Sequence, residues 1–212
     1  PICRVAGSCH RTQSKFTSDR ALILMPKRLL ALLVLSISAL AACGGPPPQR
    51  VAIPKADIAD KQRISYRTVE LREVSLPSYA AAEEIYIADE SGLLNSREGL
   101  LWADDPSRAI TLEISRHLAQ VTGAQVASEP WPFEDRAQAT VEIRVEDILA
   151  QSDGTFRLAG QYFVSTETGR DRARLFDLSV PIDGMDTVAG IAQARGQAVR
   201  NLVVEIARSG LR

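Results

Sequence analysis

The sequence is poor in the residues that thiol and metal chemistry require. Its 212 residues include three cysteines and two histidines, and only Cys43 and His117 lie beyond the N-terminal segment. A single cysteine in that part excludes an intramolecular disulfide bond there. One cysteine with one histidine supplies zinc and copper sites poorly. We therefore expect no metal or other cofactor, and we expect His117 to be a surface or packing residue.

The common catalytic motifs are also missing. The sequence contains no Gly-x-Ser-x-Gly, no His-Glu-x-x-His and no glycine-rich phosphate loop. Acidic doublets such as Glu83-Glu84 and Asp104-Asp105 could in principle act as a glycosidase pair, but doublets on loops are usually solvated surface. We predict a protein that is not an enzyme, and an envelope hydrolase that uses an acidic pair is the weaker alternative.

No apolar run is long enough to cross a bilayer comfortably, which takes roughly 20 residues. The strongest run, residues 29–42, follows the positive Lys27 and Arg28 and ends directly before Cys43. This order is typical of a signal peptide, and Leu40-Ala41-Ala42-Cys43 matches the lipobox of bacterial lipoproteins. We predict a non-native upstream extension at residues 1–24 and a signal peptide at 25–42. By resemblance to lipoproteins, acyl chains on Cys43 anchor the protein; an ordinary secretory signal is the alternative.

The chain also lacks a strong excess of positive charge. From residue 43 onward, 19 Lys and Arg face 25 Asp and Glu, a net charge of −6 with the signs scattered along the chain. Nucleic-acid binding calls for a clustered basic face, and a polybasic attraction to anionic headgroups needs the same. We therefore expect no nucleic-acid partner, and we expect membrane attachment to depend on the lipid.

The chain after the signal divides into a linker and one domain. Gly44-Gly45-Pro46-Pro47-Pro48 disfavours regular structure, because proline lacks a donor and glycine is flexible. We predict a lipidated cysteine and flexible Pro/Gly linker at residues 43–62, and a folded domain at residues 63–212.

Hydrophobic periodicity predicts both strands and helices in this domain. We expect strands at 63–74, 84–88 and 93–102, the last with a turn near 96–99, and an antiparallel meander at 139–149, 155–166 and 173–182. One helix should start at Asp105-Pro106 and end at Gly123, and a second should cover 187–209. This order predicts an α+β fold, a two-layer domain with two main helices on one face of a mostly antiparallel sheet.

Aromatic residues make up only 5% of the sequence, so those at loops are conspicuous. Tyr79 follows Pro77, Trp102 precedes the first helix, and Trp131 lies between two prolines. Exposed aromatics are frequent anchors in protein interfaces. We predict partner contacts at Tyr79, Trp102 and Trp131, with packing in the core or under a loop as the alternative for each.

These features occur in an order that resembles one family. The lipobox is followed by a strand with Tyr66, a Leu76-Pro77-x-Tyr79 motif, an Ile85-Tyr86-Ile87 strand, Trp102 before a helix, a three-strand meander and a closing helix. The chain resembles the ABC-type transport auxiliary lipoproteins. It departs from them in a longer linker before Tyr66 and in Ala80, where leucine is common.

The resemblance implies a subunit of an intermembrane lipid transport system that docks a mammalian-cell-entry-domain conduit to the outer membrane. The implied partners are that transport protein and the membrane, with a homo-oligomer left open. Gly44 and Gly45 stand where some lipoproteins carry an Asp that retains them in the inner membrane, so we expect a periplasm-facing anchor in the outer membrane. The alternative is a structural envelope lipoprotein that binds peptidoglycan or assists outer-membrane assembly.

Overall fold

The computed structural model describes residues 47–55, 61–184 and 187–212, all of which belong to one unit spanning residues 46–212. The predicted extension, the signal peptide and Cys43 lie outside the described residues. Within the described residues, no helix is both long and apolar enough to cross a membrane.

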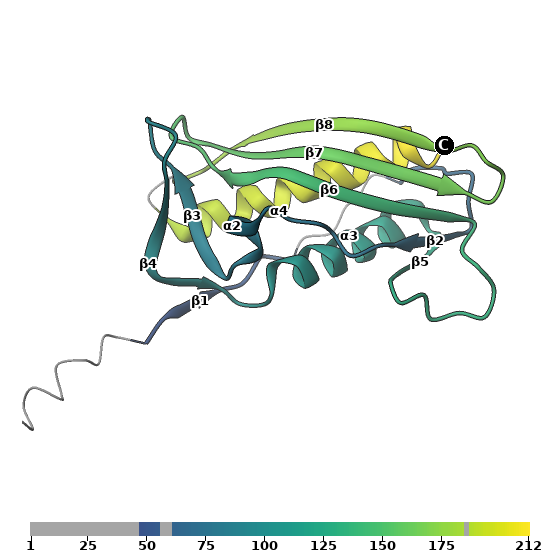
Figure 1. Cartoon of the computed structure of the whole chain (residues 1–212), viewed down its shortest axis with the longest axis horizontal. Coiled ribbons are helices and arrows are strands. Elements are labelled where there is room, and N and C mark those ends of the chain that lie inside the picture. The colour runs from purple at the N-terminus through teal and green to yellow at the C-terminus, as the bar shows by residue number, and fades with distance from the viewer. Residues whose placement is uncertain (1–46, 56–60, 185–186) are drawn as a thin grey trace, which may run out of the picture. The chain divides into compact units, whose positions relative to one another are not determined.

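An eight-stranded mixed sheet forms one layer of this unit (Figure 1). Its largest part is the predicted antiparallel meander, which consists of β6 (Ala139–Ala150), β7 (Thr155–Thr166) and β8 (Arg172–Pro181). Alternate residues of these strands, such as Val141, Ile143 and Leu158, are fully buried. The period-two pattern therefore identified the side of the meander that faces the core.

Shorter strands complete the sheet on the free side of β6. β2 (Thr68–Leu71) pairs in parallel with the beginning of β6, and β5 (Gln125–Ser128) pairs in parallel with β2. β3 (Glu84–Ala88) meets the end of β6 and pairs antiparallel with β4 (Leu94–Trp102). The two halves of β6 thus hold separate groups of strands, one at each end of the domain.

Two long helices, α3 (Pro106–Thr122) and α4 (Val188–Glu205), pack on one face of the sheet (Figure 1). The Asp105 carboxylate accepts a hydrogen bond from the Arg108 N–H at 2.8 Å and caps α3, which ends at Gly123 with φ of 69°. The apolar stripe of α3 is fully buried. A π-helical turn, η2 (Ile206–Gly210), follows α4. The predicted α+β architecture is confirmed.

The predicted linker is wrong at its centre, where β1 (Gln49–Val51) pairs in parallel with β4. Proline at the start of an edge strand costs no ladder hydrogen bond, so the preceding prolines do not prevent this pairing. Arg50 also forms an ion pair with Glu83 at 3.0 Å and donates to the Trp102 carbonyl at 3.1 Å. These two contacts help to hold β1 against β4, because three residues form few ladder hydrogen bonds.

Other boundaries also differ from the expectations. β2 is much shorter than the strand expected at 63–74, β4 continues through the turn expected near 96–99, and β5 and the short helix α2 (Ser78–Ala81) were not predicted. Gly99 has φ of 72° but stays within β4. The bounds of β2 and β5 depend on pairing with strands far away in the sequence, which local periodicity does not reveal.

Candidate functional site

A groove lies between the N-terminal segment and the first long helix. One wall is the strap, which we define as residues 51–55, and the other wall is α3 with Ala109, Leu112 and Arg116. The groove has a volume of about 340 Å³, and Trp102 lies at its end. Leu112, on the helix wall, keeps 44% of its surface exposed. Residues that follow the predicted lipid anchor therefore form part of the wall of this groove.

A buried ion pair forms the floor of this groove. Arg195 of α4 and Glu113 of α3 are 4% and 7% exposed, and Arg195 Nη1 lies 3.2 Å from Glu113 Oε2. The Arg195 guanidinium also lies 5.4 Å from the centre of the Trp102 ring, in a cation–π arrangement. Burial lowers the pKa of Arg195 from its ordinary value, and the Glu113 charge opposes this change. The pair joins the two helices beneath Trp102.

His117 continues this polar cluster into the core. It lies one turn after Glu113 and is fully buried, with Nε2 3.8 Å from Glu113 Oε1 and Nδ1 3.0 Å from Gln120 Oε1. No described group forms a hydrogen bond with Nε2. His117 is therefore a packing residue within the helix layer, as expected from the sequence.

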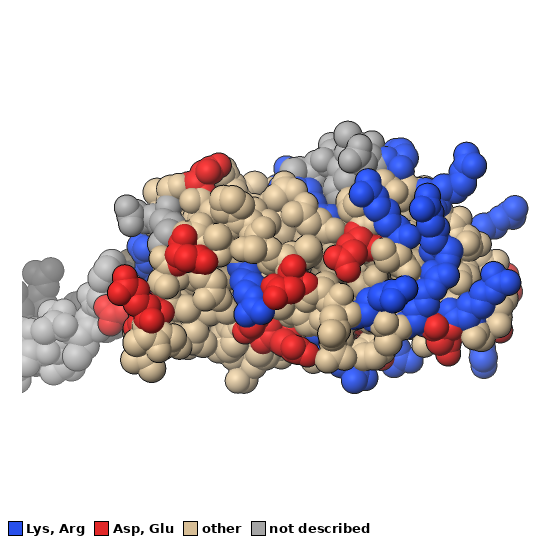
Figure 2. All heavy atoms as spheres, turned by 90° about the horizontal axis from the view of Figure 1, so that it is seen from above, with Lys and Arg blue, Asp and Glu red and all other residues tan. Residues whose placement is uncertain are grey.

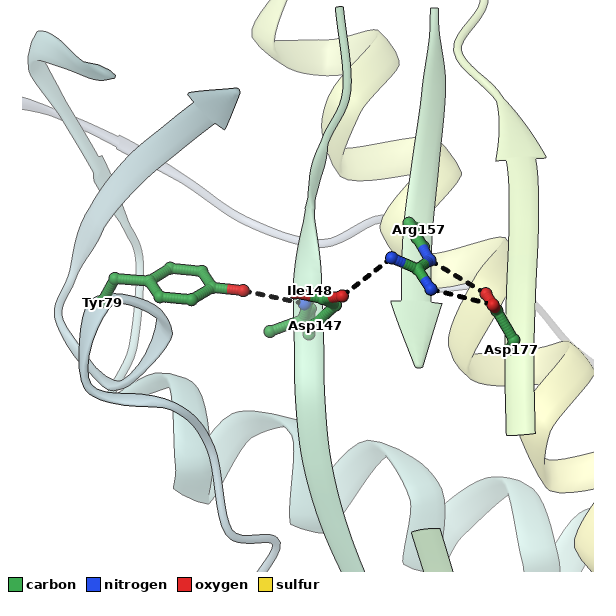
Figure 3. Close-up of polar contacts among 5 residues, drawn as sticks. All are labelled: Tyr79, Asp147, Ile148, Arg157 and Asp177. Atoms are coloured by element: carbon green, nitrogen blue, oxygen red, sulfur yellow. Dashed lines mark hydrogen bonds and ion pairs between the residues drawn. The ribbon is translucent and has the colours of Figure 1, made fainter. Parts of the chain in front are cut away.

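Tyr79 connects α2 to a bulge in β6 (Figure 3). Its hydroxyl accepts a hydrogen bond from the Ile148 N–H at 3.2 Å, just after the bulge between Val145 and Asp147. Opposite the bulge, a Cβ on Gly160 would lie 2.2 Å from the Arg144 carbonyl oxygen, so only glycine fits there. Burial raises the pKa of Tyr79, although the hydrogen bond from Ile148 opposes this.

Beside the bulge, Arg157 bridges two carboxylates (Figure 3). It binds Asp177 through Nε and Nη2 at 3.0 and 2.9 Å, and Asp147 through Nη1 at 2.9 Å. The hydrogen bonds from Arg157 lower the pKa of Asp177 below its usual range. This polar row crosses β6, β7 and β8 and fixes the sheet around the Tyr79 contact.

Of the three predicted contact residues, the structure brings together Tyr79 and Trp102 but not Trp131. Tyr79 and Trp102 line the same narrow inner cavity with Arg195. Trp131 lies in the loop at residues 129–138 between β5 and β6, where its Nε1–H donates to the Asp135 carbonyl at 2.7 Å. All three side chains are only partly exposed.

Sequence reasoning missed both the buried pair and the strap. Arg195 falls in the apolar stripe of the last helix, and a charged residue at such a position signals a buried partner. The partner, Glu113, could not be chosen from the sequence, because it lies 82 residues away on another helix. Within the described residues, no cluster of three His, Cys, Asp or Glu side chains could hold a metal ion.

The comparisons with known proteins agree with this fold. A family model described as ABC-type transport auxiliary lipoprotein component matches residues 52–207. One similar solved structure is that of an uncharacterized protein, with 16% identity, a TM-score of 0.62, and coverage of 76% of this chain and 97% of that one. Another is a protein from Xanthomonas campestris, with 16% identity, a TM-score of 0.56, and coverage of 78% and 92%.

No curated protein matches the sequence significantly. At such low identity, the likeness to solved structures shows the fold alone, and the family model carries the assignment. It describes a component of transport systems and not a family of enzymes. The match starts inside the strap and covers both helices and the whole meander. The chain therefore belongs to the ABC-type transport auxiliary lipoprotein family.

Proposed function

We propose that this protein is a non-catalytic, lipid-anchored subunit of an intermembrane lipid transport system, and that it docks a mammalian-cell-entry-domain conduit to the outer membrane. The family match over residues 52–207 is the observation that carries this proposal. The lipobox at Cys43 supports the anchor, and Gly44 and Gly45 support the outer membrane. In this role the domain positions the conduit at the membrane and catalyses no reaction.

The position of β1 supports a short connection to the membrane. Because Gln49 already pairs with Leu100 of β4, the six residue steps from Cys43 to Gln49 can span at most about 20 Å, at roughly 3.3 to 3.6 Å per residue. The groove beneath the strap then stays close to the membrane that holds the lipid. We propose Tyr79 and Trp102, which lie around the inner cavity beside this groove, as the region nearest to a docked conduit.

The test is crosslinking and mass spectrometry of the intact lipoprotein in membranes, with Cys43→Ala as the control. We expect a mammalian-cell-entry-domain protein among the crosslinked partners. The control should lose both the outer-membrane fraction and that partner. Crosslinks to peptidoglycan-bound or outer-membrane assembly proteins alone, with no transport protein, would replace this proposal with a structural envelope role.

A matched pair of variants separates docking from folding. Trp102→Ala opens the groove and removes the ring over Arg195, so we expect weaker crosslinking to the conduit. Leu93→Ala, at an exposed position between β3 and β4, should leave it unchanged. Equal losses in both variants would show that the groove has no special role in docking.

A further inference from the structure

Arginines gather at the end of the domain opposite β1. Figure 2 shows Lys and Arg over the end where the β7–β8 turn and the C-terminal residues lie, and Asp and Glu over much of the other half. We call the first region the arginine-rich end. It is defined by six exposed side chains: Arg63, Arg67, Arg170, Arg174, Arg208 and Arg212.

The fold brings these arginines together from distant segments. The Ser65 N–H donates to the Leu211 carbonyl at 2.9 Å, which joins the chain before β2 to the C-terminal residues. Arg172 Nη1 donates to the Gly210 carbonyl at 2.6 Å, which joins the start of β8 to η2. The cluster is a product of the tertiary structure, and for that reason the net charge of the chain did not reveal it.

The arginine-rich end has positive charge that the protein itself does not neutralise. Within the part of the chain that the structure describes, none of the six arginines forms an ion pair. With Arg136 and Arg172, arginines outnumber the carboxylates in the same segments, which are Glu129, Glu134, Asp135, Glu167, Asp171 and Glu205. Unpaired guanidinium groups at one surface attract anionic partners and bind phosphate well.

Two aromatic side chains lie at the same end. The loop at residues 129–138 carries Trp131 and Phe133, whose rings are 4.9 Å apart in an edge-on contact, and Phe133 is 43% exposed. The end of this loop is held beside the arginine segments, because Gln138 Oε1 accepts the Arg67 N–H at 2.7 Å and its carbonyl accepts the Glu167 N–H at 3.3 Å. Basic and aromatic side chains thus lie at the same end of the domain.

We propose that the arginine-rich end, with Trp131 and Phe133, is a docking surface for the anionic headgroups of a phospholipid membrane. Arginines attract the phosphates, and tryptophan and phenylalanine are favoured at the boundary between headgroups and acyl chains. An acidic protein surface would also match the charge, and aromatic side chains anchor protein interfaces as well, so it is the alternative that the experiment below separates. A lipid surface accounts for both features.

This surface is separate from the predicted anchor. β1, which follows Cys43 in the sequence, lies at the opposite end of the domain (Figure 1). The domain therefore has one end tied to a membrane by lipid and another that binds headgroups directly. The inference goes beyond the docking proposed above and does not depend on the identity of the transport partner.

The test uses residues 46–212, the unit that contains the whole described core and lacks both Cys43 and the signal peptide. Its binding is measured by co-sedimentation with vesicles of phosphatidylcholine alone and of phosphatidylcholine mixed equally with phosphatidylglycerol. We expect binding only to the mixed vesicles, and we expect high salt to abolish it. Failure to bind the mixed vesicles at low salt would overturn the proposal.

Two variants and a matched control locate the surface. The triple variant R170Q/R174Q/R208Q should bind on the order of 100-fold more weakly, because each arginine near an anionic surface contributes about fivefold. W131S/F133S should bind roughly tenfold more weakly at unchanged charge. The control R72Q/R108Q/R144Q removes the same number of positive charges from exposed positions outside the groove and the arginine-rich end and should bind like the parent.

Other outcomes would overturn the proposal. Equal losses in the triple variant and in its control would show a general charge effect and no docking surface. If the parent bound no vesicles while the triple variant lost its crosslinks to a transport protein in membranes, the occupant would be an acidic protein surface. Circular dichroism of each variant confirms that it is folded.

Discussion

Three arginines toward the β1 end of the domain are paired with carboxylates, whereas those that define the arginine-rich end are not. Arg50, Arg157 and Arg195 each form an ion pair with a carboxylate, whereas Arg63, Arg174 and Arg208 form none within the described residues. Paired arginines join strands and helices, so their loss should affect folding. Unpaired ones leave their charge available to a partner, so their loss should affect binding.

The largest effect is expected for Arg195→Ala at the β1 end. The substitution leaves Glu113 buried without its partner, which should cost about 3 to 5 kcal/mol in the free energy of unfolding. Urea denaturation measures this cost. The double variant R195M/E113L, which removes both charges, should recover most of the loss, and a double variant as unstable as Arg195→Ala would contradict this account.

A smaller effect is expected at the start of α3. Asp105→Ala removes the acceptor for the Arg108 N–H and should cost about 1 kcal/mol of unfolding free energy. Asp105→Asn keeps an acceptor at the same position and should cost much less. Thermal or urea unfolding of both variants tests this, and equal losses would mean that the cap contributes nothing.

Two carboxylates should give stability opposite dependences on pH. The pKa of Asp177 is lowered by its hydrogen bonds with Arg157, so its stabilisation is complete above the unfolded value of about 3.9 and is lost as the pH falls through the folded pKa. Burial raises the pKa of Glu205. As the pH falls, Glu205 therefore takes up its proton in the folded state before it does so in the unfolded state. The free energy of unfolding rises as the pH falls from the folded pKa toward the unfolded value of about 4.3.

Unfolding curves between neutral and acid pH test both signs. In Asp177→Asn, the free energy of unfolding should fall less steeply below about pH 4 than in the parent. In Glu205→Gln, the rise in the free energy of unfolding that accompanies acidification above about pH 4 should disappear. A parent and an Asp177→Asn variant with the same acid dependence would show that the Arg157 bridge does not contribute to stability.

The smallest effect is expected for the triple variant R170Q/R174Q/R208Q. Since these side chains are exposed and unpaired within the described residues, their loss should change the free energy of unfolding by no more than about 0.5 kcal/mol. A larger loss in urea denaturation would mean that the arginine-rich end also has a structural role, and the contrast between the two ends would weaken.

The sequence predicted the elements whose signals are local. Asp105-Pro106 and Gly123 marked the ends of α3, and alternation predicted the three strands of the meander. It did not predict β1, whose pairing with β4 joins residues about 50 positions apart, nor β5, where Gln125 and Ser128 leave no apolar alternation.

The candidate sites were less predictable than the fold. Trp102 was chosen as a loop aromatic, and it does line the groove beside the strap, but the groove also needs the strap and the pair of Glu113 with Arg195. The arginine-rich end was missed because net charge averages over the chain. Only the folded structure brings the segments that carry Arg63 and Arg208 together, through the contact between Ser65 and Leu211.

The parallel pairing of β1 with β4 also has a mechanical consequence. A pull along β1 from the anchor predicted at Cys43 would shear the hydrogen bonds to β4 together, because the strand is drawn along its own axis and is not peeled from its end. The strap would transmit this force to α4, since Ile53 lies against α4 at Gly196, where an added Cβ would come within 3.2 Å of its side chain. Three residues of strand thus form the joint between the predicted anchor and the helix layer.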